Sequence, residues 1–415
     1  MYWTRREMLK ATALGLMGKS ILGWAESTPA HASTSHPALI DVPNIDESDY
    51  QARLAKAKEL MTQRKIDALL ITGGSSLYYF GGFNWHRSER LFAMIIPRKG
   101  TPVFVCPAFE EQRVQELINS DYKIYTWQEH ESPYQLIKRI FAEFKIATGR
   151  IGIEETVRFF EMNGIAKAAS SLILVSGDPV TIGCRSIKSK KELEIMHKAN
   201  EITVQAYEAG LIKLRQGMNE NDTAKIVSEE FRKIGVQGGV FVLHGENSAY
   251  PHGTKNKQPL KEGMIVLMDG GCKLNGYSSD ITRTIVFGEP TEKQLKIWDI
   301  VRKAQDKALE AAKVGVPCGE VDTAARKVIV QAGFGPEYKY FTHRLGHGIG
   351  LDGHEWPYLV KGNSLPLTPG MTFSDEPGIY LYGEFGIRLE DIMYIDEEGG
   401  KLFTKQSLSL TQPFN

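Results

Sequence analysis

The clearest hydrophobic pattern in the chain is a pair of apolar runs separated by a turn signal, which together predict a β-hairpin. The run Met264–Met268 leads to Asp269, and the β-rich run Ser278–Phe287 carries Asp280. Asn275-Gly276 lies between the runs and is a preferred pair for a tight two-residue turn. This turn sets a register with three predicted pairs: Lys273 with Ser278, Gly271 with Asp280, and Asp269 with Thr282.

The predicted register places two carboxylates on one face of the hairpin. Side chains alternate along a strand, so Asp280 shares a face with Thr282 and therefore with Asp269. As diagonal neighbours across the strands, the two acids would lie roughly 7–8 Å apart at the backbone. They would repel each other and resist desolvation unless a cation lay between them. The hairpin therefore predicts a metal site.

Other periodic runs predict two domains. In the first half, helical spacing of apolar residues alternates with short buried strands, which indicates an α/β domain. Its predicted helices are 50–65, 109–119 and 134–144, and its predicted strands are 68–72, 91–96, 102–106 and 151–153. In the second half, antiparallel strand signals between helices indicate an α+β architecture. Its predicted helices are 189–214, 220–235, 291–314 and 319–333, and its predicted strand runs are 239–244, 264–287, 371–376 and 388–396.

The amino terminus predicts export. Thr4–Lys10 resembles a twin-arginine export motif, a mildly apolar stretch over Ala11–Ala25 follows, and Ala30-His31-Ala32 is typical of a cleavage site. The alternative is a disordered or helical extension. We expect a periplasmic or secreted protein with no membrane span later in the chain. The predicted organisation is a signal peptide over 1–32, a linker over 33–47, the α/β domain over 48–180 and the α+β domain over 181–415.

Composition narrows the function classes. The chain of 415 residues is long enough for two domains and a sizeable core. Its 50 basic and 50 acidic residues balance, which gives no electrostatic case for a nucleic-acid partner. The cysteines are widely spaced and form no CxxC pair, so we expect buried structural thiols. They are Cys106, Cys184, Cys272 and Cys318.

Three further residues of metal-ligand type stand in special settings. His347 lies in a glycine-rich run, where we expect the backbone to bend and leave the imidazole unobstructed. Glu376 follows a strand-like run and precedes Pro377-Gly378, and Glu390 alternates with Arg388 onto one face of a predicted strand. Taken singly, each is weak evidence, because lone histidines are usually structural and lone acids on strands usually face solvent.

Taken in order, the five residues resemble the ligand set of the pita-bread metallopeptidases: Asp269, Asp280, His347, Glu376 and Glu390. The motifs Asp-Gly-Gly, Ser-Asp-Ile-Thr-Arg-Thr, Gly-His-Gly-Ile-Gly, Glu-Pro-Gly and Arg-Leu-Glu-Asp are all present in the second half. The first half resembles the non-catalytic domain of the creatinase, prolidase and aminopeptidase P branch, which methionine aminopeptidases usually lack. The resemblance implies the pita-bread fold and a dinuclear metal centre.

The resemblance also implies a role for each ligand. Asp269 would chelate one metal, Asp280 and Glu390 would bridge both metals, and His347 and Glu376 would complete the second. Carboxylate and imidazole ligands favour Mn²⁺, Co²⁺, Fe²⁺ or Zn²⁺ over a thiolate-bound metal, and Mn²⁺ is our first expectation. Two such ions, roughly 3.5–4 Å apart, lower the pKa of a bridging water and polarise the scissile carbonyl. Glu376 would then act as general base.

Three other histidines and an arginine match family positions. His252 would lie near the leaving group, His354 matches the outer-shell histidine of the family, and His343 matches a histidine of its proline-specific branch. They would stabilise the tetrahedral intermediate and carry a proton to the leaving nitrogen, or serve only as loop-stabilising polar residues. Arg388 would pair with a bridging carboxylate or receive the substrate carboxylate, and the sequence leaves both roles open.

A loop of the first domain is a second candidate for substrate contact. Phe83–Arg90 is rich in aromatic and basic residues, and in the family such loops reach the active site of a neighbouring subunit. We therefore expect a homodimer in which Trp85, His86 or Arg87 helps to define the substrate pocket. The alternative is an exposed, salt-bridged turn.

The resemblance implies hydrolysis of an Xaa-Pro bond in a dipeptide or short peptide, by either an Xaa-Pro dipeptidase or an Xaa-Pro aminopeptidase. The proline amide lacks an N–H, so it suits a site whose histidines address the imide nitrogen. Two alternatives stay open. One is a metal-dependent small-molecule amidohydrolase or lyase of the same fold. The other is a metal-free creatinase-like hydrolase or binding protein, against which the five intact ligands argue.

Overall fold

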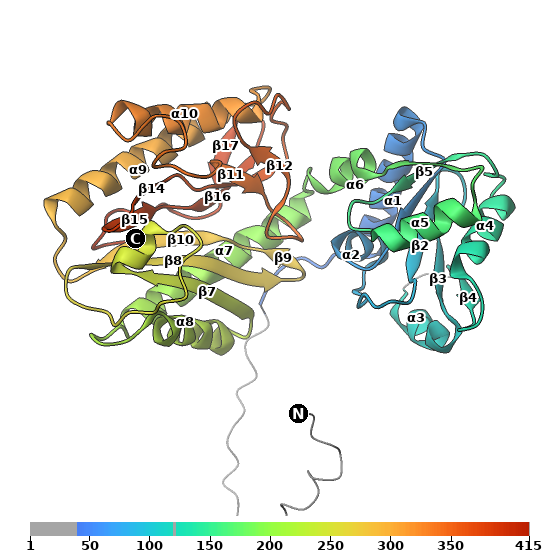
Figure 1. Cartoon of the computed structure of the whole chain (residues 1–415), viewed down its shortest axis with the longest axis horizontal. Coiled ribbons are helices and arrows are strands. Elements are labelled where there is room, and N and C mark those ends of the chain that lie inside the picture. The colour runs from blue at the N-terminus through green and yellow to red at the C-terminus, as the bar shows by residue number, and fades with distance from the viewer. Residues whose placement is uncertain (1–39, 119–121, 415) are drawn as a thin grey trace, which may run out of the picture. The chain divides into compact units, whose positions relative to one another are not determined.

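The computed structural model describes residues 40–118 and 122–414, and the predicted export motif, apolar stretch and cleavage site lie outside these residues. The described chain forms an α/β region followed by an α+β region, as the hydrophobic pattern predicts (Figure 1). The helix α6, Asp178–Arg185, spans the predicted boundary at residue 180.

The α/β region is built on a six-stranded mixed sheet in the order β4-β3-β2-β1-β5-β6. The strand β2 is antiparallel to both of its neighbours, and the other neighbouring pairs are parallel. The two strands that the sequence did not predict, β4 and β6, are the edge strands, whose side chains are largely unburied. The strands are β1 Ala68–Ile71, β2 Ala93–Pro97, β3 Val103–Pro107, β4 Lys123–Trp127, β5 Arg150–Ile153 and β6 Ile173–Ser176.

Helices cover this sheet, and the first begins with a strong local signal. The Asp46 carboxylate accepts backbone N–H groups of the first turn while Asp49 reaches back to the Asp46 backbone, which forms a capping box. The helices of the region are α1 Glu47–Arg64, α2 Ser75–Gly81, α3 Glu111–Leu117, preceded by the 3₁₀ turn Ala108–Glu110, α4 Pro133–Glu143, α5 Phe159–Ala168 and α6.

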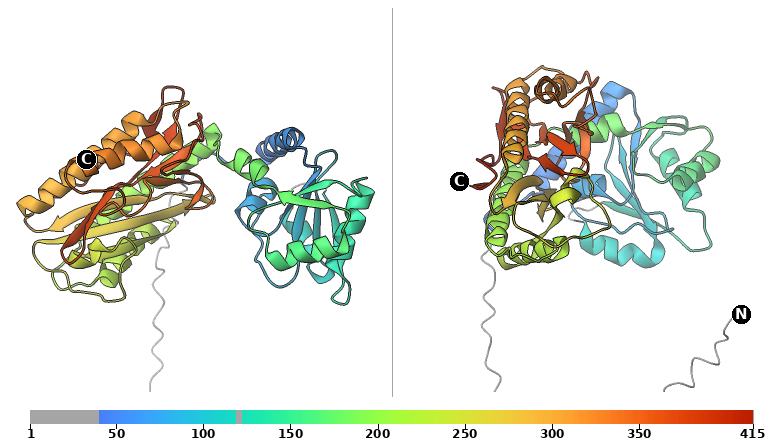
Figure 2. Two further views of the ribbon diagram at one scale, coloured as in Figure 1. Left: turned by 45° about the horizontal axis from the view of Figure 1, so that its top comes forward. Right: turned by 60° about the vertical axis from the view of Figure 1, so that its left-hand side comes forward.

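The α+β region holds two larger antiparallel sheets between two pairs of helices, and a further two-stranded sheet, β14-β15 (Figures 1 and 2). The helices α7, Lys190–Leu211, and α8, Glu220–Ile234, pack on the sheet β10-β8-β7, and the helices α9, Glu292–Ala311, and α10, Cys318–Gln331, pack on the sheet β12-β11-β13-β16-β17. The remaining strands are β7 Gln237–His244, β8 Met264–Leu274, β9 Tyr277–Ser278, β10 Ile281–Phe287, β11 Gly346–Gly348, β12 Glu355–Leu359, β13 Thr372–Asp375, β14 Gly378–Leu381, β15 Phe385–Arg388, β16 Asp391–Ile395 and β17 Gly400–Leu402.

The hairpin β8–β10 has the predicted turn and register. Asn275 and Gly276 both have positive φ, 46° and 84°, as a type I′ turn requires. Two of the three predicted pairs form: Lys273 with Ser278, and Asp269 with Thr282. The third prediction, Gly271 with Asp280, was wrong, because the strand is interrupted between Ser278 and Ile281.

Ser279 explains this interruption. Its hydroxyl accepts a hydrogen bond from the Cys272 backbone N–H at 2.8 Å, so its side chain is turned back onto β8. The Ser279 carbonyl oxygen lies only 2.1 Å from where a Cβ on Gly271 would stand. Glycine at 271 therefore permits the close approach, and Asp280 leaves the ladder.

The sequence predicted one continuous strand over 388–396, and this prediction was also wrong. The chain forms β15 up to Arg388 and β16 from Asp391, and these strands belong to different sheets. Between them, Glu390 pairs with Thr282 of β10, and its backbone N–H donates to the Thr282 carbonyl at 3.2 Å. The break therefore joins the second large sheet to the hairpin.

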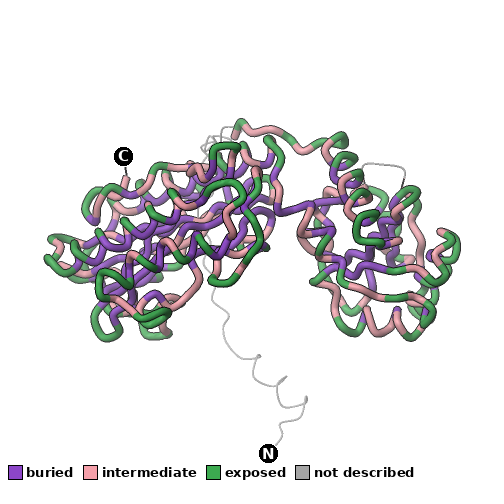
Figure 3. Tube along the Cα trace, turned by 90° about the horizontal axis from the view of Figure 1, so that it is seen from above, coloured by how far each residue is buried: buried purple, intermediate pink, exposed green. Residues whose placement is uncertain are grey.

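Burial follows the sheets, with buried segments along the strands and exposed segments on the outer turns of helices and in loops (Figure 3). The four cysteines are free and buried, which confirms their predicted structural role. Across residues 40–118 and 122–414, no helix combines the length and apolarity of a membrane span.

Candidate metal centre and active site

All five predicted ligands line one cavity of about 240 Å³ in the α+β region. Each lies on a strand or directly beside one, where backbone pairing fixes its position. Asp269 lies on β8, Asp280 precedes β10, His347 lies on β11, Glu376 follows β13, and Glu390 lies between β15 and β16.

The ligand atoms form overlapping groups of three, each with its atoms within 4.8 Å of one another. One group joins Asp269, Asp280 and Glu390, and a second joins His347, Glu376 and Glu390. A third joins Asp280 and His347 to His354. Among the carboxylates, Glu390 and Asp280 each belong to two groups, whereas Asp269 and Glu376 each belong to one; His347 also belongs to two. This sharing fits the bridging positions that the resemblance implies for Asp280 and Glu390.

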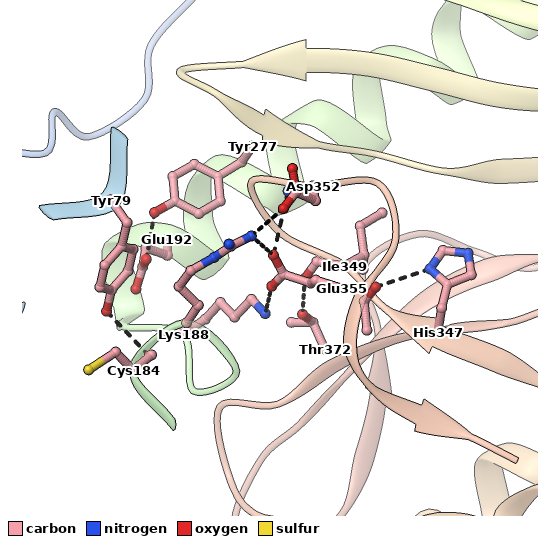
Figure 4. A network of polar contacts seen from close by, with 12 residues as sticks. Tyr79, Cys184, Lys188, Glu192, Tyr277, His347, Ile349, Asp352, Glu355 and Thr372 are labelled. Atoms are coloured by element: carbon pink, nitrogen blue, oxygen red, sulfur yellow. Dashed lines mark hydrogen bonds and ion pairs between the residues drawn. The ribbon is translucent and has the colours of Figure 1, made fainter. Parts of the chain in front are cut away.

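His347 is held in the tautomer that a metal needs. Its Nδ1 lies 3.1 Å from the Gly348 carbonyl oxygen, to which a protonated Nδ1 donates (Figure 4). The unprotonated Nε2 then faces the acids, 3.3 Å from Glu376 Oε1 and 4.0 Å from Asp280 Oδ2. Burial, together with the neighbouring His354, lowers the pKa of His347 to about 3. A neutral imidazole is the form that binds metal.

The glycines beside His347 also have a packing role that the sequence did not predict. His347 lies within the short strand β11, whose pairing with β12 shifts register between His347 and Gly348. A Cβ on Gly346 would stand 1.9 Å from the Ser374 carbonyl oxygen, and one on Gly348 would stand 2.6 Å from the Glu355 carbonyl oxygen. The glycines therefore let β13 and β12 approach β11 closely.

The carboxylates of the cavity are short of positive charge. Burial raises the pKa of Glu376 to about 7, and it raises those of Asp280 and Glu390 well above their ordinary values, with repulsion from neighbouring acids adding to the shift. Buried acids in mutual contact favour a bound cation. Because the donor set consists of carboxylate oxygens and one neutral imidazole nitrogen, these residues fit hard or borderline divalent metal ions.

Hydroxyl groups orient two of the predicted ligands. Thr282 Oγ1 donates to Glu390 Oε2 at 2.6 Å, and Ser374 Oγ donates to Glu376 Oε1 at 3.0 Å. Ser374 Oγ also accepts the His347 backbone N–H at 2.9 Å. Such contacts hold metal ligands in a fixed orientation.

Arg388 is bonded to three side chains of the site, and a role in binding substrate stays a prediction. Its Nη2 pairs with Asp269 Oδ2 at 2.5 Å, its Nη1 donates to the Tyr380 hydroxyl at 3.0 Å, and its Nε donates to Thr282 Oγ1 at 3.2 Å. The residue is 2% exposed. Arg388 therefore orients a ligand and its surroundings, and its partner is Asp269 rather than one of the predicted bridging acids.

The three additional histidines also line the cavity. The His354 ring stacks on the His347 ring with centroids 3.7 Å apart, and the His252 side chain is exposed toward the cavity. His343 is bonded at both ring nitrogens, with Nδ1 at 2.8 Å from the Arg344 carbonyl oxygen and Nε2 at 2.7 Å from the Tyr380 hydroxyl. His343 is thus placed to orient Tyr380, and proton transfer stays a prediction for His252 and His354.

The predicted substrate loop of the α/β region does not line this cavity. Trp85 stacks on Phe92 with ring centroids 4.3 Å apart, and Arg87 donates to the Gly73 carbonyl and the Thr156 hydroxyl. His86 lines a separate cavity of about 190 Å³. A role for these residues in a neighbouring subunit stays a prediction.

A buried ion-pair group holds the loop that carries His354. Asp352 and Glu355 flank this histidine, and each lies 2.6 Å from Arg185 Nη2 (Figure 4). Glu355 also pairs with Lys188 Nζ at 2.7 Å. Arg185 is the last residue of α6, and Lys188 follows that helix. Residues remote in sequence therefore fix the position of His354.

Sequence reasoning missed several residues of the site. Arg344 lines the cavity. The hydroxyl groups of Tyr380, Thr282 and Ser374 form hydrogen bonds with charged side chains that line the cavity. The available signals were weak: Thr282 shares a predicted strand face with Asp280, and Arg344 adjoins His343. A local pattern does not reveal which hydroxyl reaches which carboxylate.

Comparisons with known proteins agree with this geometry. Residues 194–397 match the model of metallopeptidase family M24, and residues 53–187 match the creatinase/prolidase N-terminal domain. An uncharacterised peptidase of Schizosaccharomyces pombe is 37% identical over 383 residues, which cover 86% of this chain and 83% of that protein.

Two solved structures extend the likeness. Dipeptidase PepE from Mycobacterium ulcerans has a TM-score of 0.84 and 32% identity, covering 89% of this chain and 99% of that one. Xaa-Pro dipeptidase from Bacillus anthracis has a TM-score of 0.77 and 29% identity, covering 87% and 99%. The predicted pita-bread fold with its additional amino-terminal domain is therefore confirmed, and this chain belongs to metallopeptidase family M24.

Proposed function

We propose that this chain is a dinuclear-metal hydrolase that cleaves Xaa-Pro bonds in dipeptides or short peptides. The observation that carries the proposal is the convergence of the five ligand residues in overlapping groups around one cavity. The similar dipeptidase and Xaa-Pro dipeptidase structures support the substrate class. The cavity of about 240 Å³ suits a small substrate, since it is below the roughly 300–1,000 Å³ of typical ligand pockets.

The five ligand residues would hold two divalent metal ions. Asp269, Asp280 and Glu390 would hold one divalent ion, and His347, Glu376 and the shared acids would hold the other. Bound there, the ions would polarise the scissile carbonyl and lower the pKa of a water molecule. Mn²⁺ is our first candidate for both positions, with Co²⁺, Zn²⁺ and Fe²⁺ as alternatives.

Proton movement would depend on Glu376 and on two histidines of the cavity. The carboxylate of Glu376, oriented by Ser374, would accept the proton of the attacking water. His252 and His354 would donate hydrogen bonds to the developing oxyanion and pass a proton to the proline nitrogen. That nitrogen carries no hydrogen in the substrate, so it must gain one to leave as an amine.

A substrate series on metal-loaded protein tests the proposal. We expect release of proline from Gly-Pro and Ala-Pro, with little hydrolysis of Gly-Leu. Comparing Xaa-Pro with Xaa-Pro-Yaa then separates a dipeptidase from an aminopeptidase. Absence of Xaa-Pro cleavage with all four candidate metals would refute the proposal.

We also propose export by the twin-arginine route to the periplasm or the medium, and assembly as a homodimer. The order of paired arginines, a mildly apolar stretch and Ala30-His31-Ala32 supports export. Replacing Arg5 and Arg6 together by lysine should retain the protein inside the cell. Equal export of both forms would contradict this route. Light scattering on the purified protein tests the dimer.

A further inference from the structure

Glu154 is a buried carboxylate of the α/β region that forms no ion pair within residues 40–118 and 122–414. It directly follows β5, and it is 2% exposed. Its oxygens accept hydroxyl groups instead: Ser76 Oγ donates to Oε1 at 3.0 Å, and Thr156 Oγ1 donates to Oε2 at 2.6 Å. A carboxylate buried this deeply is costly unless its charge is compensated, so the partners of these two hydroxyl groups matter.

Each of the two hydroxyl groups also accepts a hydrogen bond from an arginine. Ser76 Oγ accepts from Arg185 Nη1 at 3.2 Å, and Thr156 Oγ1 accepts from Arg87 Nη2. Hydrogen bonds in a chain polarise one another, so a hydroxyl that accepts from a cation is a stronger donor to the carboxylate. Glu154 therefore lies at the centre of a continuous path of hydrogen bonds between the two arginines.

One end of the path lies in the Phe83–Arg90 loop, the candidate loop for substrate contact. Arg87 also donates to the Gly73 carbonyl. A Cβ on Gly74, whose φ is 144°, would stand 2.5 Å from Arg87 Nη2. The glycine leaves room for the guanidinium against the turn that follows β1. This turn leads into α2, so the loop is held on the segment that carries Ser76.

The other end of the path holds the loop that carries His354. Arg185 Nη2 pairs with Asp352 and Glu355, which flank this histidine (Figure 4). The His354 ring stacks on the His347 ring, but its nitrogens form no hydrogen bond in the described parts of the chain. The position of His354 therefore depends on the residues that flank it, and Arg185 holds both of them.

We propose that Glu154 is a positioning residue, through which the Phe83–Arg90 loop influences the placement of His354 in the active site of the same chain. This inference rests on the proposed function, in which His354 assists the reaction. A shift of the loop would weaken the bonds of Glu154 and, through them, the hold of Arg185 on the loop of His354. Misplacing a catalytic group by about 1 Å can cost about 100-fold in rate, so a small shift is enough.

The first experiment asks whether Glu154 acts through His354, because contiguous contacts alone do not establish coupling. The values of kcat and KM for Gly-Pro are measured on metal-loaded Glu154→Gln, His354→Ala and the double variant. Glutamine has the size of glutamate, but its NH₂ group cannot accept a hydroxyl, so one link is broken. We expect kcat to fall about 30-fold in Glu154→Gln and KM to change less than about 3-fold. In the His354→Ala background, Glu154→Gln should cost less than about 2-fold.

Two hydroxyl deletions divide the path on either side of its central carboxylate. Ser76→Ala removes the link to Arg185 and should lower kcat by about the same 30-fold. Thr156→Val keeps the shape of the side chain and removes the link to Arg87, so it should lower kcat about 5-fold, as should Arg87→Met. None of these substitutions should have a further effect in the His354→Ala background. If Arg87 instead contacted substrate directly, Arg87→Met would keep its full cost there.

Glu161→Gln is the matched control. Glu161 is a carboxylate of the same region that is 1% exposed, and it pairs with Arg158 outside the path. Its substitution should lower the Tm and leave kcat unchanged. A loss of activity that followed from lost stability alone would appear in this variant too.

A second measurement needs no turnover. Chelator-treated protein is labelled with isotope-enriched histidine, and the NMR signals of the His354 imidazole are identified by their absence from His354→Ala. These signals should shift in Glu154→Gln and Ser76→Ala, because the ring moves relative to the stacked His347. They should stay unchanged in Glu161→Gln.

The outcomes separate this proposal from the proposed function. Glu154→Gln overturns the positioning role if it lowers kcat no further than Glu161→Gln, or if it keeps its full cost without His354. Unshifted His354 signals would overturn it as well, and all three results leave Xaa-Pro hydrolysis standing. A full cost of Arg87→Met without His354 would overturn the link to the loop. A wild type that cleaves no Xaa-Pro substrate would refute the proposed function, and the His354 signals would then decide the positioning role by themselves.

Discussion

Two charged clusters, each largely buried, lie next to the loop that carries His354, and their charge balance differs. In the loop anchor, formed by Arg185, Lys188, Asp352 and Glu355, two cations face two acids. In the metal cluster, formed by Asp269, Asp280, His347, Glu376 and Glu390, four acids surround a neutral histidine, and Arg388 is their paired cation.

The difference teaches how to tell a structural cluster from a functional one. In the loop anchor each cation is paired with an acid. The metal cluster keeps buried acids in contact, which raises their pKa values and destabilises the folded chain until a cation binds. Three experiments break or sharpen this comparison.

The largest effect is expected from Asp280→Asn in the metal cluster. The variant removes a carboxylate shared by two ligand groups, so we expect loss of bound metal and a fall in kcat/KM of at least about 1,000-fold. The metal-free variant should be at least as stable as the metal-free wild type, because a repulsive charge is gone. Metal analysis, kinetics and thermal unfolding check these points; near-normal activity would show that the hairpin is only structural.

A matched pair of substitutions tests the loop anchor. Glu355→Gln leaves the buried Lys188 without a negatively charged partner, so the free energy of unfolding should fall by about 3–5 kcal/mol. Glu337→Gln breaks an exposed pair with Lys361 and should have little effect, since solvent screens it. Denaturant unfolding measures both. A small effect of Glu355→Gln would mean that the anchor contributes little to stability.

The smallest effect concerns pH. Burial raises the pKa of Glu376 to about 7 in the folded metal-free chain, above its ordinary 4.5. The folded state therefore holds this proton more tightly than the unfolded state, and stability is lost as pH rises through 4.5 to 7. The contribution of Glu376 to the Tm of chelator-treated protein, measured as the difference in Tm between the wild type and Glu376→Gln, should fall over that range. Metal-loaded protein should show the opposite trend, because metal ions compete with protons for the same ligands.

Local signals predicted much of the hairpin and several helix starts. Asn275-Gly276 adopts positive φ at both residues, and Ser189 with Glu192 forms a capping box at the start of α7. These features depend on neighbouring residues alone, so a sequence pattern contains them. The edge strands β4 and β6 escaped prediction because their side chains are largely unburied and the alternation of polar and apolar positions is weak.

By itself, the sequence determined the five ligand residues as candidates, the pairing of Asp269 with Thr282, and the two-domain class of fold. The tertiary structure alone decided which charges meet. It paired Arg388 with Asp269, placed Glu390 between two sheets, and brought Arg344 to the cavity. The physical reason is that turns and caps are satisfied within a few residues, whereas a buried charge takes its partner from whichever strand the fold brings within reach.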